Sequence, residues 1–151
     1  LARRQSALKK GERMSVPSGR RGESDLLVHQ KADELAKYTL HITENEKVFD
    51  PRQAMLLGMI TESAVNIGKC LWMANNIYVR DESDMRKRLE LQSEGALHCN
   101  ELMYLIRLSG PVFHLKKKRV GHWAAMTAEV RSLARGWREK DAARYKKKLN
   151  L

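Results

Sequence analysis

Hydrophobic residues recur at alternating steps of three and four along the chain, and the clearest run lies between residues 50 and 78. Asp50 and Pro51 open this run with a helix-start signature, an N-cap acceptor followed by a proline at the first helical position. The apolar seam behind them would span about 40 Å at ~1.5 Å of rise per residue. It is formed by Leu57, Ile60, Ala64, Ile67, Leu71, Ala74 and Tyr78. More apolar positions flank the seam, so we expect more than one neighbour to pack against this helix; they are Leu56, Met59, Val65 and Trp72.

Two further stretches show the same spacing on either side of this helix. The first covers residues 24–46 and begins at Ser24, whose hydroxyl is expected to accept a hydrogen bond from the first turn. The other covers residues 84–109 and is expected to stop at Gly110 and Pro111. The seam of the first is formed by Val28, Ala32, Leu35, Thr39 and Ile42. The seam of the other is formed by Met85, Leu89, Gln92, Ala96, Cys99, Met103 and Ile106.

The last helical stretch follows the basic run at 116–119 and is expected to fray at 138–140. Its seam is formed by Val120, Trp123, Thr127, Val130, Ala134 and Trp137. Four helices of similar length with short connections predict an all-α fold, an up-down-up-down four-helix bundle over residues 23–145. Residues 1–22 are predicted to form a flexible basic N-terminal arm, and residues 146–151 a basic C-terminal tail.

Composition agrees with one helical domain. The chain has 151 residues, of which 6% are aromatic, and glycine and proline are sparse. The two cysteines, Cys70 and Cys99, are expected to be reduced and buried, as in a cytosolic protein. Apolar runs fall short of the ~18 residues that a membrane span needs, and the N-terminus lacks the apolar region of a signal peptide. We therefore expect a cytoplasmic protein without a membrane partner.

The tryptophans favour the core over a surface role. Trp72 and Trp123 lie on or beside apolar seams, where burial is the usual outcome. Trp137 lies among arginines, where stacking on a nucleic-acid base is conceivable. Its seam position nevertheless favours packing in the core.

The net charge of +11 is unevenly placed. Residues 1–21 carry a net charge of +6 and residues 112–148 one of +9, whereas the part between them sums to −4. A near-neutral body with two basic ends favours a polyanionic partner, and a phosphate backbone of RNA or DNA would bind by counterion release. Arg131, Arg135 and Arg138 share one helical face. With them, the candidate binding residues are Arg20, Arg21, Lys116, Lys117, Lys118, Arg119, Lys140, Arg144, Lys146 and Lys147.

Motifs for catalysis or metal binding do not emerge from the sequence. The histidines form neither HExxH nor Glu-x-x-His, and His98 and Cys99 point about 100° apart on a helix. Glu44 and Glu46 fit the polar face of an ordinary helix. A glycine-rich phosphate loop and a nucleophile elbow are both lacking. We therefore expect no enzyme, no metal and no cofactor.

The string AEVRSLARGW at residues 128–137 resembles the last helix of Avd, the accessory variability determinant of diversity-generating retroelements. The sequence Ile67-Gly68-Lys69 and the apolar run at 102–108 are also similar to that family. The resemblance covers roughly residues 28–141, nearly the whole expected bundle. The chain departs from the family in its basic N-terminal arm and its lysine-rich tail.

The resemblance implies a small basic four-helix bundle that assembles as a homopentamer. It also implies a protein that binds a reverse transcriptase and its template RNA and supports mutagenic cDNA synthesis without catalysing it. The basic positions of the family match Lys69, Arg131, Arg135 and Arg138. Two alternatives remain: the four-helix protein encoded within ribosomal RNA intervening sequences, and a mobilisation or phage DNA-binding accessory protein.

Overall fold

The computed structural model describes residues 23–151, and the side chains from residue 26 onward. The expected arm at 1–22, with Arg20 and Arg21, lies outside these residues, and the side chain of the expected cap Ser24 is outside the described side chains. The described part is all-helical and contains no strand, as the hydrophobic spacing predicted. Its elements are α2 (Glu23–Thr43), a short 3₁₀ helix η1 (Pro51–Gln53), α3 (Ala54–Asn75), α4 (Glu82–Val112) and α5 (Lys117–Lys148).

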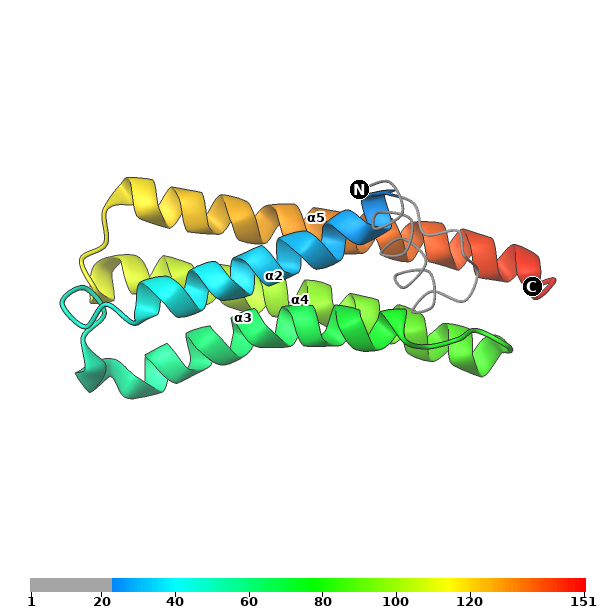
Figure 1. Ribbon diagram of the computed structural model, residues 1–151, viewed down its shortest axis with the longest axis horizontal. Coiled ribbons are helices and arrows are strands. Elements are labelled where there is room, and N and C mark those ends of the chain that lie inside the picture. Colours follow the sequence, from blue (N-terminus) through cyan, green and yellow to red (C-terminus); the bar gives the residue numbers. More distant parts are fainter. Residues whose placement is uncertain (1–22) are drawn as a thin grey trace, which may run out of the picture.

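The four α-helices of this part lie lengthwise beside one another (Figure 1). Each packs against two others, in the order α2, α3, α4, α5 and back to α2. Trp123 Nε1 of α5 donates to Thr39 Oγ1 of α2 at 3.0 Å. Ser63 Oγ of α3 donates to Glu101 Oε1 of α4 at 2.8 Å. In this order α3 lies across the bundle from α5, so their outer surfaces face different directions.

The predicted seams form the core. All five seam residues of α2 are buried, and so are the mid-seam residues of α3 from Ile60 to Ala74. Trp123 and Trp137 of α5 are buried as well, with 0% and 3% of their surfaces exposed. The buried Thr127 hydroxyl donates to the Trp123 carbonyl at 2.9 Å, so burial leaves that hydroxyl paired.

Two aromatic residues expected inside lie on the surface. Trp72 is 60% exposed and Tyr78 is 51% exposed, so their predicted core positions are wrong. Trp72 follows the buried Leu71 by one position, which turns its side chain about 100° away from the core. Helix α3 ends at Asn75, so the helical period no longer applies at Tyr78, and Val79 is buried in the connection instead.

The acidic cap predicted at Asp50 agrees with the structure, and α4 begins at a second acidic cap, two residues before the predicted start at 84. Asp50 Oδ1 accepts from the Arg52 amide at 2.9 Å, although the turn it caps is η1, which leads directly into α3. Asp81 Oδ1 accepts from the Asp84 amide at 2.8 Å at the start of α4. The carboxylates of Glu82 and Asp84 in this first turn also interact favourably with the positive end of the helix dipole.

The sequence predicted that α4 stops at Gly110 and Pro111, and this prediction is wrong. The helix ends at Val112, and the Leu115 amide donates back to the Gly110 carbonyl at 2.9 Å while His114 adopts a φ of 52°. This is a Schellman-type end with a left-handed residue. Pro111 lies in the last turn of α4 and has no amide hydrogen to donate to the carbonyl of Arg107. The extra residues place Phe113 in the core, 5.0 Å between ring centres from Phe49.

Helix α5 continues to Lys148, so the fraying expected at 138–140 is wrong. Asp141 and Tyr145 are buried at steps of four after Trp137 and extend the seam by two turns. The helix ends like α4, because the Leu151 amide donates to the Lys146 carbonyl at 2.9 Å and Asn150 has a φ of 58°. The first part of the expected tail at 146–151 is therefore the last turn of α5.

A close contact between α3 and α4 gives the first prediction. Leu71 is fully buried, and a Cβ added at Gly95 would lie 2.8 Å from Leu71 Cδ2. We expect Leu71→Ala to cost ~2–5 kcal/mol and Gly95→Ala to cost ~1–3 kcal/mol, through a cavity and through overpacking. The double variant should lose less than the sum, because the smaller residue makes room for the new methyl.

Chemical denaturation measures these free energies of unfolding. Leu97→Ala is the matched control, since Leu97 is 63% exposed and surface changes stay within about 0.5 kcal/mol. A loss below about 1 kcal/mol for Leu71→Ala would show that this contact is not part of the core.

Candidate nucleic-acid interface

Three arginines of α5 follow the line where α5 meets α4. Arg131 Nη1 donates to Asn100 Oδ1 of α4 at 2.8 Å. Arg138 Nε donates to the main-chain carbonyl of Leu89 at 3.3 Å. Arg135 is exposed between them. We call Arg131, Arg135 and Arg138 the arginine row.

The positive charges of the arginine row are not neutralised within residues 26–151. None of the three forms an ion pair there, and their hydrogen-bond acceptors are an uncharged amide and a main-chain carbonyl. Glu129 lies 3.9 Å from Lys31 of α2 instead. Glu139 is exposed and makes no ion pair in this part of the chain. The row therefore presents three uncompensated cations to an anion.

The thiol of Cys99 on α4 is buried beneath this row. Burial raises the pKa of Cys99 to about 12, although the charges of Arg131 and Arg135 act in the opposite direction. Burial likewise raises the pKa of Cys70, assisted by the nearby Glu94 carboxylate. Both cysteines are free and buried, as the sequence predicted, and both stay protonated at neutral pH. They are therefore poor nucleophiles.

The four residues of the basic run at 116–119 lie at the start of α5 and differ in their surroundings. Lys116 is the N-cap and provides no side-chain hydrogen bond, and the first turn contains no acidic residue. Lys117 and Lys118 are exposed there, at the positive end of the helix dipole, where cations are unfavourable and anions are favourable. Arg119 is half-buried and turns toward α2, where it lines a cavity with Tyr38, His41, Ile42, Glu44 and Asn45.

The remaining predicted residues do not form one continuous surface. Lys69 is exposed on α3, across the bundle from α5, so the fold does not bring it to the arginine row. Arg144 Nη2 donates to Asp141 Oδ1 at 2.6 Å and packs over the Tyr145 ring, which gives it a structural role. The other exposed lysines of α5 in the set are Lys140, Lys146 and Lys147. The last two occupy the final turn, where cations interact favourably with the helix dipole.

Helix α4 adds residues that sequence reasoning did not single out. Asn100 holds Arg131, and one turn further along the same helix Tyr104 is 55% exposed. The guanidinium carbon of Arg107 lies 5.6 Å from the centre of the Tyr104 ring. Isolated polar positions on the outside of a helix carry no periodic signal. The spacing of three between Tyr104 and Arg107 is the one hint the sequence offers.

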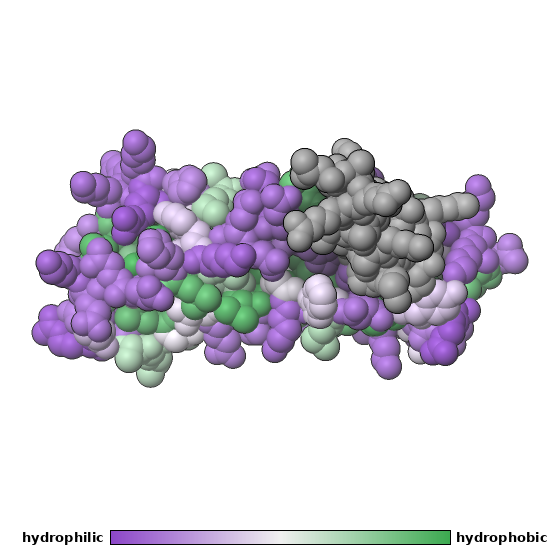
Figure 2. All heavy atoms as spheres, in the orientation of Figure 1, coloured by the Kyte–Doolittle hydropathy of each residue, from purple (hydrophilic) through white to green (hydrophobic). Residues whose placement is uncertain are grey.

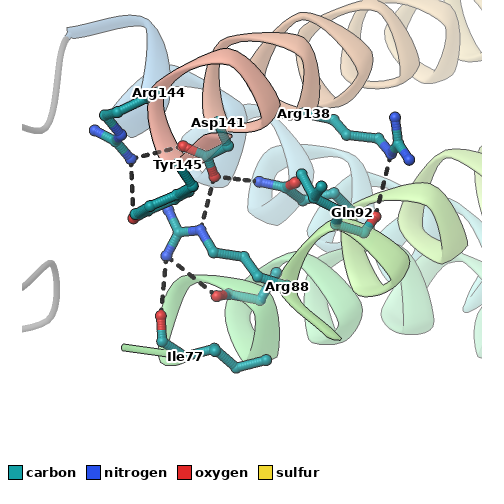
Figure 3. Close-up of polar contacts among 9 residues, drawn as sticks. Ile77, Arg88, Gln92, Arg138, Asp141, Arg144 and Tyr145 are labelled. Atoms are coloured by element: carbon teal, nitrogen blue, oxygen red, sulfur yellow. Dashed lines mark hydrogen bonds and ion pairs between the residues drawn. The ribbon is translucent and has the colours of Figure 1, made fainter. Parts of the chain in front are cut away.

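A buried ion pair fixes how α5 sits on α4 (Figure 3). Arg88 Nε donates to Asp141 Oδ2 at 2.7 Å, with side chains 1% and 2% exposed. Gln92 Nε2 donates to the same oxygen at 2.7 Å, and Arg88 Nη1 donates to the carbonyls of Ala74 and Ile77, each at 3.3 Å. The Arg88 guanidinium also lies 5.1 Å from the centre of the Trp137 ring. Arg88 therefore ties α4 to α5 and to the end of α3.

More acidic residues lie near one end of the arginine row than near the other. A groove beside Arg138 is lined by the apolar Met85, Leu89 and Leu97, by Glu90 and Glu94, and by Arg86, which pairs with Glu82. The carboxylates of Glu90 and Glu94 oppose phosphate binding at this end. The end marked by Arg131 has the neutral Asn100 as its α4 partner, so it is the better place for an anion.

Other chemistries find no support in the described residues. Between residues 26 and 151, no group of three histidine, cysteine or acidic side chains is arranged to hold a metal ion. None of the helices described here combines the length and apolarity that crossing a bilayer requires. The chain matches no family model, no curated protein and no solved structure.

The buried ion pair gives the second prediction. Arg88→Met leaves Asp141 buried without its main partner, and we expect a loss of ~3–5 kcal/mol in unfolding free energy. Arg88→Met combined with Asp141→Asn should lose less than the sum of the two single changes, because the amide oxygen still accepts from Gln92 and carries no charge. Denaturant titrations of the three variants measure this coupling.

Arg86→Met is the control for this cycle. Its side chain is 66% exposed and pairs on the surface with Glu82, so its removal should change stability by under about 1 kcal/mol. Equal losses for Arg86→Met and Arg88→Met would contradict a structural role for the buried pair.

Proposed function

We propose that this protein is a non-catalytic, nucleic-acid-binding accessory protein whose arginine row contacts a phosphate backbone. The observation that carries the proposal is the absence of any carboxylate partner for Arg131, Arg135 and Arg138 within residues 26–151. Arginines that stabilise a fold pair with acids inside it, as Arg88 and Arg144 do with Asp141. The row has no such pairs, and its guanidinium groups suit phosphate oxygens.

Binding of this kind is driven by charge. Each phosphate that the row neutralises releases counterions, so the affinity depends on salt and hardly on sequence. Lys117 and Lys118, at the start of the same helix, extend the positive surface. The row and these lysines span about 30 Å at ~1.5 Å per residue. Such a surface suits RNA and DNA alike, since phosphate contacts position a nucleic acid without reading its bases.

The more specific proposal is an Avd-type accessory protein of a diversity-generating retroelement. It would bind a reverse transcriptase, template RNA and cDNA and support mutagenic reverse transcription. The resembling string at 128–137 lies in α5 and carries two members of the arginine row, which supports this assignment. The two free cysteines fit the reducing cytoplasm in which such a protein would act.

The proposed topology is an up-down-up-down bundle. Contacts between α3 and α4 support it, because Ser63 meets Glu101 while Cys70, further along α3, meets the earlier Glu94. The same reversal holds for α4 and α5, where Arg131 meets Asn100 and Arg138 meets Leu89. Neighbouring helices that exchange contacts in this order run in opposite directions.

The protein is further proposed to be a homo-oligomer, and a pentamer if it follows Avd. The face in Figure 2 carries an apolar patch among polar side chains, toward the end of the bundle that holds the α2–α3 connection. Exposed hydrophobic residues gather on α3: Met55, Met59, Val65, Trp72 and Met73. Apolar surface of this kind is typical of contacts between proteins.

The third prediction tests phosphate binding. Replacing Arg131, Arg135 and Arg138 by glutamine should make the slope of log affinity against log salt shallower by roughly two units, at about 0.7 per phosphate on a single strand. Fluorescence anisotropy with a labelled oligonucleotide measures that slope. Helicity should not change and the melting temperature should change little, because Arg135 is exposed and the other two arginines each contribute one hydrogen bond to α4.

The matched control replaces the same three arginines by lysine. That variant keeps the charges and should keep the slope, although it loses the forked donor geometry. If the glutamine variant melts earlier and binds as before, the row stabilises the fold or the assembly and the phosphate proposal fails.

The fourth prediction concerns assembly. Static light scattering at micromolar concentration should give a mass several times the 17.4 kDa of one chain. Trp72→Glu should lower that mass if the outer face of α3 lies in the interface, because a buried unpaired carboxylate is strongly unfavourable. Leu40→Glu is the control, because it also replaces an exposed hydrophobic residue by one carboxylate, but on α2. A 17.4 kDa monomer for the unchanged protein would rule out the oligomer.

A further inference from the structure

Tyr104 is an aromatic residue on the outer surface of α4. Its side chain is 55% exposed. Among the described residues, its ring has one cation–π contact, with the Arg107 guanidinium 5.6 Å from the ring centre, and no contact with another aromatic ring. Its hydroxyl makes no hydrogen bond with any of those residues. Core packing therefore does not explain this ring, and it is accessible to a ligand.

The ring lies at the edge of the arginine row. Asn100, which accepts from Arg131 at 2.8 Å, precedes Tyr104 by four residues on α4. Four residues advance a helix by about 6 Å and turn it by about 40°, so the two side chains share one flank. Arg107 follows by three residues on that flank. Arg131 and Arg107 thus place one cation on each side of the Tyr104 position along α4.

The acids near Tyr104 are directed elsewhere. Glu101 accepts from Ser63 Oγ of α3 at 2.8 Å and from His98, and these hydrogen bonds lower the pKa of its carboxyl. It therefore stays ionised but is held on the flank that faces α3. Glu90 and Glu94 lie beside Arg138, at the opposite end of the arginine row. The Tyr104 end is the more positive one.

We propose that Tyr104 and Arg107 form a base-stacking platform beside the arginine row, so that the nucleic acid bound there is single-stranded. The inference rests on the proposed function and adds the class of strand to it. Phosphates would lie along Arg131 and Arg135 while a base stacks on the Tyr104 ring, with Arg107 as its cationic neighbour. Bases inside a duplex are already stacked on one another, so a duplex would use the arginines and not the ring.

Trp72 is the other large exposed ring to consider. It is 60% exposed on α3 and makes no ring contact within the described residues. Helix α3 lies across the bundle from α5, so a base on Trp72 would be far from the arginine row. Trp72 is therefore not part of a binding site with the arginine row, and its exposed ring fits the proposed oligomer interface instead.

The experiment measures binding of the full chain to three labelled probes of about 12 nucleotides, a length within the usual range for single-strand sites. The probes are a single-stranded RNA, an abasic strand of equal length and a duplex of the same sequence. Tyr104→Leu should weaken binding of the single-stranded RNA by about 5- to 100-fold, since a stacked base contributes on this scale. Tyr104→Phe keeps the ring, so it should stay within about twofold of the unchanged protein.

The abasic strand and the duplex separate stacking from charge. Tyr104→Leu should leave the binding of both probes unchanged within about twofold. It should also keep the slope of log affinity against log salt, because it removes no cation. The unchanged protein should bind the abasic strand about as weakly as Tyr104→Leu binds the intact strand.

Three results would overturn the inference. If Tyr104→Leu leaves single-strand affinity unchanged while the salt slope persists, the arginine row binds phosphates and the platform does not exist. If Tyr104→Leu weakens all three probes equally, the residue acts through the fold and not through stacking. If the unchanged protein binds none of the probes in a salt-dependent manner, the proposed function fails together with the inference.

Discussion

The contact between α4 and α5 depends on the buried ion pair of Arg88 and Asp141. A charge removed from water is strongly destabilising unless it is paired and hydrogen-bonded. Here the Asp141 carboxylate accepts from Arg88, Gln92 and Arg144, and Arg88 also reaches two main-chain carbonyls. These bonds hold only when α5 lies on α4 in one register. That register brings Arg131 opposite Asn100 and Arg138 opposite Leu89.

Two groups of cations on α5 differ in the partners of their side chains. Arg144 pairs with Asp141, and Lys148 Nζ donates to the Val79 carbonyl at 3.1 Å, so both fasten the end of the helix. Arg131, Arg135 and Arg138 have no carboxylate partner in the described part of the chain. The net charge of this segment is therefore a poor guide to function, and the distribution of partners is a better one.

Much of the fold followed from the sequence, because the spacing of apolar residues reports the buried face of each helix. It could not show where a helix ends when the end depends on one left-handed residue, as at His114. It also missed the last turns of α5. Asp141 reads as a surface residue until its partner Arg88, 53 positions away, is brought next to it. The excess of apolar residues on α3 led to Trp72 being placed in the core, although no helix of the described part covers it.

The candidate site was foreseeable on α5 and not on α4. Steps of four and three place the arginines on one face whatever the tertiary structure, whereas Tyr104 joins them only through the packing of two helices. Like charges at these spacings destabilise a helix by ~0.2–0.5 kcal/mol per pair. The chain has acids at Glu129 and Glu139, but neither pairs with the row within residues 26–151. Cations that repel one another and lack internal partners weaken the free protein slightly, and a bound polyanion would remove that repulsion. The hydrogen bonds to Asn100 and to the Leu89 carbonyl use only part of the donors of Arg131 and Arg138, and the proposed phosphate backbone along α5 would pair with the remaining ones.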